Sequence, residues 1–183
     1  TAAAAAGLSG QEFRLGSPVA DFSVNDVKGA PVRFSTIKGD YTVVLFIATQ
    51  CPVSNAYNER MKALYASYAV KGVKFVAINS NATEPAAEVE EHAANNKFPF
   101  AVYKDPNNVV ADRFGAQFTP EAFLLGRGDV IVYHGAIDDS QNPASIKSQH
   151  LRSALDDVLA GRPAGRTETR AFGCTIKRVR KTQ

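Results

Sequence analysis

Apolar residues gather in two long runs in the first half of the chain, at 41–48 and 73–78. Both runs are nearly continuous and rich in β-branched residues, which is typical of strands buried on both faces of a sheet. Between them, apolar side chains recur every three or four residues from 57 to 68, and this spacing predicts a helix that Lys71-Gly72 closes. The order strand, helix, strand predicts two parallel strands joined by a right-handed crossover.

Shorter segments complete the pattern of an α/β domain with a mixed sheet. A hairpin is predicted at 22–34, around a turn at 25–29, and a second hairpin turn at 126–129. Further helices are predicted at 85–96, 109–114 and 145–159, the first of them capped from within 81–84, and further strands at 100–103, 121–125 and 130–133.

Length and composition predict one globular domain. The 183 residues suffice to bury a sizeable core, and 45% hydrophobic with 21% charged residues is ordinary for this class. We expect a flexible N-terminus at 1–12, a folded domain at 13–160 and a basic C-terminal tail at 161–183 that carries Cys174. No apolar run approaches the roughly 20 residues of a membrane-spanning helix, so no membrane span is expected.

Positive charge is concentrated in the tail. The net charge is +3, and the segment from Gly161 onward holds seven Lys or Arg and one Glu. Such a tail can bind polyanions, but no aromatic interleaving or nucleic-acid motif accompanies it, so we expect a solvated tail and no nucleic-acid partner. The Ala-rich start without Met matches the end left by A-x-A cleavage, and a plain disordered tail explains it equally well. We expect an exported, periplasmic protein, with a cytoplasmic location as the alternative.

Cys51 is the strongest candidate for chemistry. It lies where a strand passes into the amino end of a helix, and there unpaired backbone N–H groups and the helix dipole favour an anion. Cysteines in this position have pKa values below the free value of about 8.5, so we expect a reactive thiol partly open to solvent. Pro52 suits the first helical position, and the Ser54 hydroxyl lies on the same face to donate a hydrogen bond to the thiolate. The alternative is a small buried hydrophobic residue, the usual role of a lone cysteine.

Other polar residues have weaker signals. Thr49 and Gln50 can orient a substrate or serve only as turn residues. The histidines lie on separate predicted elements without metal-ligand spacing, so no metal is expected. Carboxylates outside the turn are interpreted as the solvated face of a helix (Glu88, Glu90, Glu91) or as a solvated loop (Asp138, Asp139).

The ordered elements resemble a thioredoxin-fold redoxin of the peroxiredoxin-like, alkyl hydroperoxide reductase/thiol-specific antioxidant (AhpC/TSA) type. The resemblance covers roughly 15–160 and rests on the first hairpin, the strand at 43–48, the turn Cys51-Pro-Val-Ser54, and Thr119-Pro120 before the second hairpin. It implies a thioredoxin-like fold, in which helices flank a mixed central sheet with an N-terminal β-hairpin. It also implies a cis-proline loop that faces Cys51 and leaves the Thr119 backbone free to pair with an extended substrate segment.

Two departures from better-defined redoxins leave the subclass open. Ser54 stands where thioredoxins carry their second cysteine. Counting back from Cys51, Val44 and Ala48 replace the Pro and Thr/Ser of the peroxiredoxin pattern Pro-x-x-x-Thr/Ser-x-x-Cys.

Cys174 is the second cysteine and lies in Phe172-Gly-Cys-Thr-Ile-Lys177. Some redoxin-like proteins end with a similar Gly-Cys-x-Ile-Lys segment, and this resemblance implies that the segment docks near the active turn. We hypothesise that Cys174 is a resolving or bridging partner of Cys51; the alternative is a free thiol in a mobile tail.

Three functions are consistent with these features. The first is a thiol–disulfide oxidoreductase in which Cys51 attacks a protein or small-molecule disulfide, assisted by Ser54, Thr119, Pro120 and Gln50, and is resolved by Cys174 or an external thiol reductant. The second is a thiol peroxidase that acts on peroxide. The third is a non-catalytic binding module in which Cys51 is a relic or a structural bridge. None of the three is expected to need a cofactor.

Overall fold

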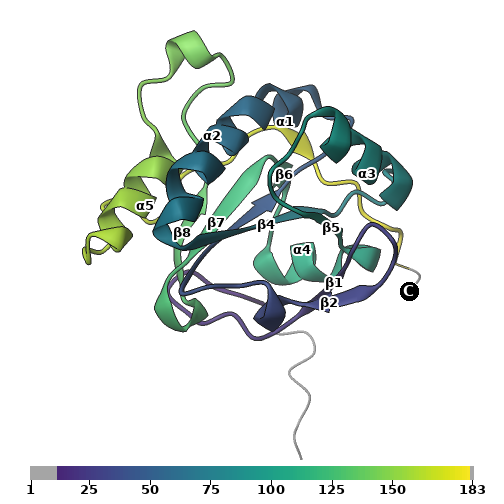
Figure 1. The fold of residues 1–183 in the computed structure, drawn as a ribbon, viewed down its shortest axis with the longest axis horizontal. Coiled ribbons are helices and arrows are strands. Elements are labelled where there is room, and N and C mark those ends of the chain that lie inside the picture. Colours follow the sequence, from purple (N-terminus) through teal and green to yellow (C-terminus); the bar gives the residue numbers. More distant parts are fainter. Residues whose placement is uncertain (1–11, 182–183) are drawn as a thin grey trace, which may run out of the picture.

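The computed structural model describes residues 12–181, so the N-terminal segment expected to be flexible lies outside the described residues except for Glu12. A seven-stranded sheet crosses the centre of the molecule in the order β2-β1-β5-β4-β3-β7-β8 (Figure 1). Its strands are β1 (Ser23–Asn25), β2 (Pro31–Arg33), β3 (Tyr41–Phe46), β4 (Val73–Asn79), β5 (Val102–Lys104), β7 (Glu121–Leu125) and β8 (Ile131–Gly135).

The two long apolar runs form the central parallel pair, as predicted. β3 pairs with β4 from Tyr41↔Val73 to Phe46↔Ile78, and β5 adds a third parallel strand beside β4. On its other side, β3 pairs antiparallel with β7, and β8 follows as the hairpin partner of β7. The mixed sheet and the N-terminal hairpin of β1 and β2 are therefore confirmed.

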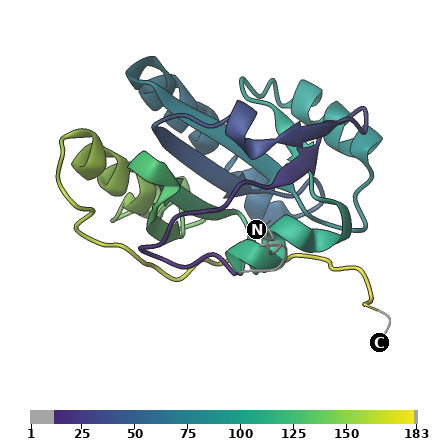
Figure 2. The same ribbon diagram turned by 90° about the horizontal axis from the view of Figure 1, so that it is seen from below.

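Helices cover both faces of this sheet, which explains why its central strands are predominantly apolar. Buried residues of α2, α3 and α5 pack against one face, and α4 packs against the other, as Figure 2 shows from below. The helices are α1 (Pro52–Ala56), α2 (Asn58–Tyr68), α3 (Ala86–Asn95), α4 (Val109–Phe114) and α5 (His150–Leu159).

An aromatic cluster seals the face that α4 covers. The ring of Phe114 lies 4.9 Å from that of Phe123 and 5.7 Å from those of Phe46 and Phe22. Aromatic side chains bury large apolar areas and favour such edge-to-face contacts. Ile176, from the far end of the chain, is buried in the same cluster and so attaches the C-terminal segment to α4.

Two helix starts differ from the sequence prediction. The helix predicted from residue 145 begins at His150, because Pro143–Ser145 forms one 3-10 turn and Ile146 then returns to extended backbone. The residues at 81–84 do not cap α3, which begins at Ala86 behind Pro85 without a side-chain cap. Their polar groups bind the active-site turn and the C-terminal segment instead.

Residues 161–181, which we call the C-terminal strap, are docked on the domain, although six of their seven basic side chains stay exposed as expected of a solvated tail. They run from α5 along one end of the sheet to the side of α4 (Figures 1 and 2). Within the strap, β9 (Cys174–Thr175) pairs antiparallel with β6 (Phe118–Thr119). Arg178 and Lys181 bind Asp112 on α4 at 2.9 and 2.7 Å, so part of the tail's positive charge is neutralised within the molecule.

Within residues 12–181, no helix combines the length and apolar character needed to cross a membrane.

Candidate active site

Cys51 is the N-cap residue of α1. Its backbone is extended (φ −86°, ψ 117°), and its sulfur accepts a hydrogen bond of 3.3 Å from the backbone N–H of Ser54. Pro52 follows at the first helical position, where a missing N–H costs nothing. The structure thus confirms that the sulfur lies at the amino end of a helix, where a negative charge is favoured.

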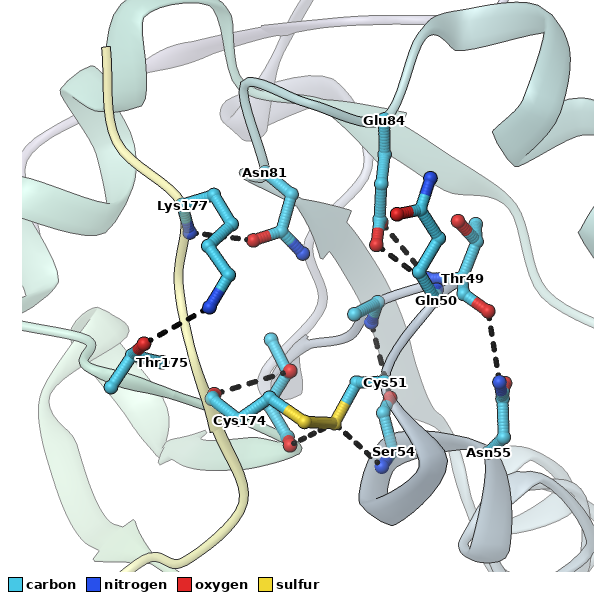
Figure 3. Close-up of a disulfide and its surroundings, with 12 residues drawn as sticks. Thr49, Gln50, Cys51, Ser54, Asn55, Asn81, Glu84, Cys174, Thr175 and Lys177 are labelled. Atoms are coloured by element: carbon cyan, nitrogen blue, oxygen red, sulfur yellow. Dashed lines mark hydrogen bonds between the residues drawn. A yellow bond between two sulfur atoms is a disulfide. The ribbon is translucent and has the colours of Figure 1, made fainter. Parts of the chain in front are cut away.

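Cys51 and Cys174 form a disulfide, with their Cα atoms 5.9 Å apart (Figure 3). The hypothesised pairing is confirmed, and the alternative of a free tail thiol is wrong for this state of the protein. Cys51 is only 4% exposed, because the strap covers the sulfur that we expected to be partly open. Cys174 is the more accessible partner, since it is only half-buried.

The bond between Thr119 and Pro120 is cis, as the resemblance implied. The carbonyl oxygen of Thr119 lies 3.5 Å from the sulfur of Cys51, so the loop faces the disulfide directly. The Thr119 backbone is occupied, however. It stands opposite Cys174 in the pairing of β6 with β9, the position that an extended substrate segment was expected to take.

Gly173 makes this close approach possible. Its φ of +147° is rarely adopted by other residues, and a Cβ atom added there would lie 2.1 Å from the carbonyl oxygen of Thr119. The residue before Cys174 must therefore be glycine for the strap to sit in this position.

The Ser54 hydroxyl has a different partner in the oxidised protein. It is buried and accepts a hydrogen bond of 3.1 Å from the N–H of Ala48, at the end of the turn that follows β3. Without this bond the buried N–H of Ala48 would have no hydrogen-bond partner, and an unpaired buried donor lowers stability. The backbone N–H of Ser54, rather than its hydroxyl, reaches the sulfur.

Glu84 organises the turn before Cys51, although no pattern in the sequence singled it out. Its buried carboxylate accepts hydrogen bonds from the backbone N–H groups of Thr49 (2.9 Å) and Gln50 (3.0 Å) (Figure 3). It also accepts one from the Asn79 side chain (2.6 Å). Burial alone would raise its pKa, but these hydrogen bonds outweigh burial and hold the pKa of Glu84 below its usual value. The carboxylate is therefore charged at neutral pH. Its position after β4, at the carboxyl end of a strand beside β3, was the available signal.

A second layer of polar side chains supports the same turn. Glu88 accepts hydrogen bonds from the hydroxyl of Thr49 and from the Gln50 amide (3.0 Å), so the interpretation of Glu88 as part of a solvated helix face is wrong. Asn55 donates to the carbonyl oxygen of Thr49 at 2.8 Å and bonds His92 at 2.7 Å. Burial lowers the pKa of His92 despite the nearby carboxylates, which favours the neutral ring.

The remaining candidates have structural partners. His134 bonds Glu121 at 2.6 Å, and the other carboxylate oxygen of Glu121 accepts the N–H of Phe118 (2.9 Å), which supports the cis-proline loop. Asp138 was interpreted as part of a solvated loop, but it is buried and pairs with Arg60 at 2.7 Å. No group of residues among 12–181 is arranged to hold a metal ion.

A pocket of about 170 Å³ opens directly onto the disulfide. Both cysteines line it, so it is a route by which a small molecule can reach the sulfurs. Polar residues make up most of its remaining lining, among them Gln50, Asn81, Thr83, Glu84 and Lys177, although about half of the lining surface is apolar. Figure 3 shows Asn81 and Lys177 on one side of this space and Glu84 with Gln50 on the other.

Comparison with known proteins agrees with this geometry. The sequence pattern of the AhpC/TSA family matches residues 15–134. A curated relative, the thiol-disulfide oxidoreductase ResA of Bacillus thuringiensis (strain Al Hakam), is 25% identical over 122 residues, which is 67% of this chain and 69% of that protein.

Two solved structures are similar over almost the whole chain. An uncharacterized conserved protein from Geobacillus kaustophilus has a TM-score of 0.85 and 32% identity, covering 93% of this chain and 95% of that one. A hypothetical protein from Sinorhizobium meliloti 1021 has a TM-score of 0.82 and 32% identity, covering 92% and 97%. More distant structures share the thioredoxin-like fold, which confirms the expected fold class.

Proposed function

Because the chain belongs to the AhpC/TSA family, we propose that it is a thiol–disulfide oxidoreductase in which Cys51 and Cys174 form the working redox couple. The observation that carries the proposal is the disulfide itself. One of its sulfurs caps a helix and lies 3.5 Å from the residue before a cis-proline. The relative named thiol-disulfide oxidoreductase supports the same chemistry.

The reaction starts from the reduced dithiol. The Cys51 thiolate, stabilised by the Ser54 N–H and the helix dipole, attacks one sulfur of a substrate disulfide and expels the other sulfur as a thiolate. The Cys174 thiolate then attacks the sulfur of Cys51 in the mixed disulfide and expels the second substrate thiol. The substrate disulfide is reduced to two thiols, and the protein dithiol is oxidised. An external thiol reductant returns the protein to its starting state.

Positioning residues hold this geometry. Thr119 and Pro120 present the loop against which Cys174 is paired. Gln50 contributes its backbone N–H to Glu84 and lines the pocket. We assign Ser54 a positioning role through its backbone N–H, with its hydroxyl holding the preceding turn.

We also propose an exported, oxidising location. Disulfides form and persist in extracytoplasmic compartments and are rare in the cytosol. A disulfide in the chain therefore supports export. Trapping free thiols with a maleimide in intact cells, followed by cell fractionation, tests the exported location. Protein recovered from the cytoplasm with both cysteines reduced would contradict it.

The activity is tested by mixing the reduced protein with glutathione disulfide or insulin and following thiol release. We expect wild-type protein to exchange and C51S to lose exchange. C174S should stop at a mixed disulfide on Cys51 that mass spectrometry detects. Exchange by C51S equal to wild type, or no exchange by wild type with either substrate, would contradict the proposal.

A further inference from the structure

The C-terminal strap is attached to the domain on both sides of Cys174 by contacts that do not involve sulfur. On the carboxyl side, the N–H of Lys177 donates to the Asn81 side chain (2.7 Å), and the N–H of Val179 donates to the Asn108 side chain (2.8 Å). Ile176 is 5% exposed in the aromatic cluster beside α4. None of these contacts involves either sulfur, so breaking the S–S bond does not remove any of them directly.

The amino side of Cys174 is held as well. Thr169 donates its N–H to the carbonyl oxygen of His134 (3.0 Å), and its hydroxyl accepts the N–H of Ala136 (3.0 Å). The ring of Phe172 packs edge-on against Tyr57, with 6.2 Å between centroids. These contacts hold the strap on the amino side of Cys174 independently of the disulfide.

A docked strap closes the usual approach to the cis-proline loop. β9 occupies β6 through the pairs Phe118↔Thr175 and Thr119↔Cys174, so an incoming extended peptide finds this edge filled. Such peptides gain affinity from main-chain hydrogen bonds to a free strand edge. They gain none here unless the strap leaves.

The pocket beside the disulfide still gives small molecules access to the two cysteines. Its volume of about 170 Å³ is below the roughly 300–1,000 Å³ of typical ligand sites. It suits a polar group about the size of an amino acid, because Gln50, Asn81, Thr83 and Lys177 supply polar walls. A folded protein loop does not fit such a space.

We infer that the strap stays seated in both redox states and that the couple exchanges with low-molecular-weight thiols and disulfides rather than with extended protein segments. This inference rests on the proposed function and names its substrate class. In the reductive half-reaction, a small thiolate attacks the sulfur of Cys174, the more exposed residue of the pair, and expels Cys51 as a thiolate. A second small thiolate then attacks the small molecule's sulfur in the mixed disulfide and expels Cys174 as a thiolate. Two small thiols become one disulfide, and the protein disulfide becomes two thiols.

The test compares two thiols on the oxidised full chain. One is free cysteine, and the other is a blocked peptide copying Gly173 to Lys177, the sequence best suited to the β6 edge. Each rate is normalised to the same thiol's rate with a small model disulfide, and the reduced protein is counted by maleimide mass tagging. We expect cysteine to react at least ten times faster than the peptide. I176A, which loosens the strap, should narrow this ratio, whereas V70A, an apolar truncation at an exposed site, should not.

Hydrogen exchange supplies a second measurement that needs no variant. We expect the amides of Ile176, Lys177 and Val179 to keep their protection when the disulfide is reduced. Loss of that protection, or a peptide rate equal to or above the cysteine rate in wild type, overturns the inference. Failure of the proposed function is distinguishable, because neither cysteine nor glutathione disulfide would then exchange with the couple at all.

Discussion

Replacing Gly173 by alanine tests the strap geometry at its tightest point. The added Cβ would lie 2.1 Å from the carbonyl oxygen and 2.9 Å from the carbonyl carbon of Thr119. Both are backbone atoms, so no flexible side chain can move aside to make room. The φ of +147° is also unfavourable for alanine.

The expected cost follows from these two contributions. Backbone strain of this kind costs about 1–3 kcal/mol, and overpacking costs a similar amount. We expect partial relaxation to leave a loss of about 2–4 kcal/mol in the unfolding free energy of the oxidised protein. Reduction removes the S–S bond that fixes Cys174 next to residue 173, so this residue can shift locally while the contacts on both sides keep the strap seated. Relief of about 1.4 kcal/mol of strain in this way would raise the reduction potential by about 30 mV.

Equilibrium titration in glutathione buffers, read by mass tagging of free thiols, measures this shift. G165A is the matched control, because Gly165 lies in the same strap with only one neighbouring atom, an Asp157 carboxylate oxygen 3.4 Å from an added Cβ. We expect G165A to have the wild-type potential. A G173A potential within 10 mV of wild type, with unchanged stability in urea, would refute the reasoning.

Three further changes have defined outcomes. Replacing Cys174 by serine opens a loop with a sequence separation of 123 and should lower the urea unfolding free energy by about 2–5 kcal/mol relative to the oxidised wild type; a loss below 1 kcal/mol would contradict this. E84Q replaces a carboxylate oxygen that accepts backbone N–H groups by an NH2 group that cannot accept them, and it should lower the unfolding free energy by about 2–3 kcal/mol at pH 7. Because the folded pKa of Glu84 is lowered, the carboxylate stabilises the fold above its ordinary pKa near 4.5 and loses that effect as the pH falls. The difference between wild type and E84Q should therefore shrink in acid, and a constant difference would show that the charge is irrelevant. R60M leaves Asp138 buried without its charged partner and should lower the unfolding free energy by about 3 kcal/mol. R127M breaks an exposed ion pair and should leave the unfolding free energy unchanged. Equal effects of the two variants in thermal unfolding would contradict a special contribution of the buried pair.

Features with a local signal were predicted from the sequence. The apolar runs of β3 and β4 and the helical spacing of α2 follow from periodicity, and the position of Cys51 follows from the order of those elements. The cis-proline at Thr119-Pro120 and the pairing of Cys174 with Cys51 came from the resemblance, and the structure confirms both.

The missed features depend on contacts between distant residues. Glu84 reaches the turn at Thr49 and Gln50 across 35 and 34 positions, and a buried acceptor of backbone N–H groups leaves no periodic trace in the sequence. Composition predicted a solvated tail because the segment holds seven basic residues. It does not reveal that one buried isoleucine and the backbone contacts around it dock the segment on the domain. The hydrogen bond from the N–H of Ala48 to the Ser54 hydroxyl was missed because this N–H becomes a buried donor only in the folded turn.

The reduction potential of the Cys51–Cys174 couple tests the central claim most directly. A working redox couple is expected to titrate between about −270 and −120 mV, the range spanned by thioredoxin-type exchange proteins. A value below about −300 mV, typical of structural disulfides, would contradict the account and would mean that the disulfide only fastens the strap to the domain.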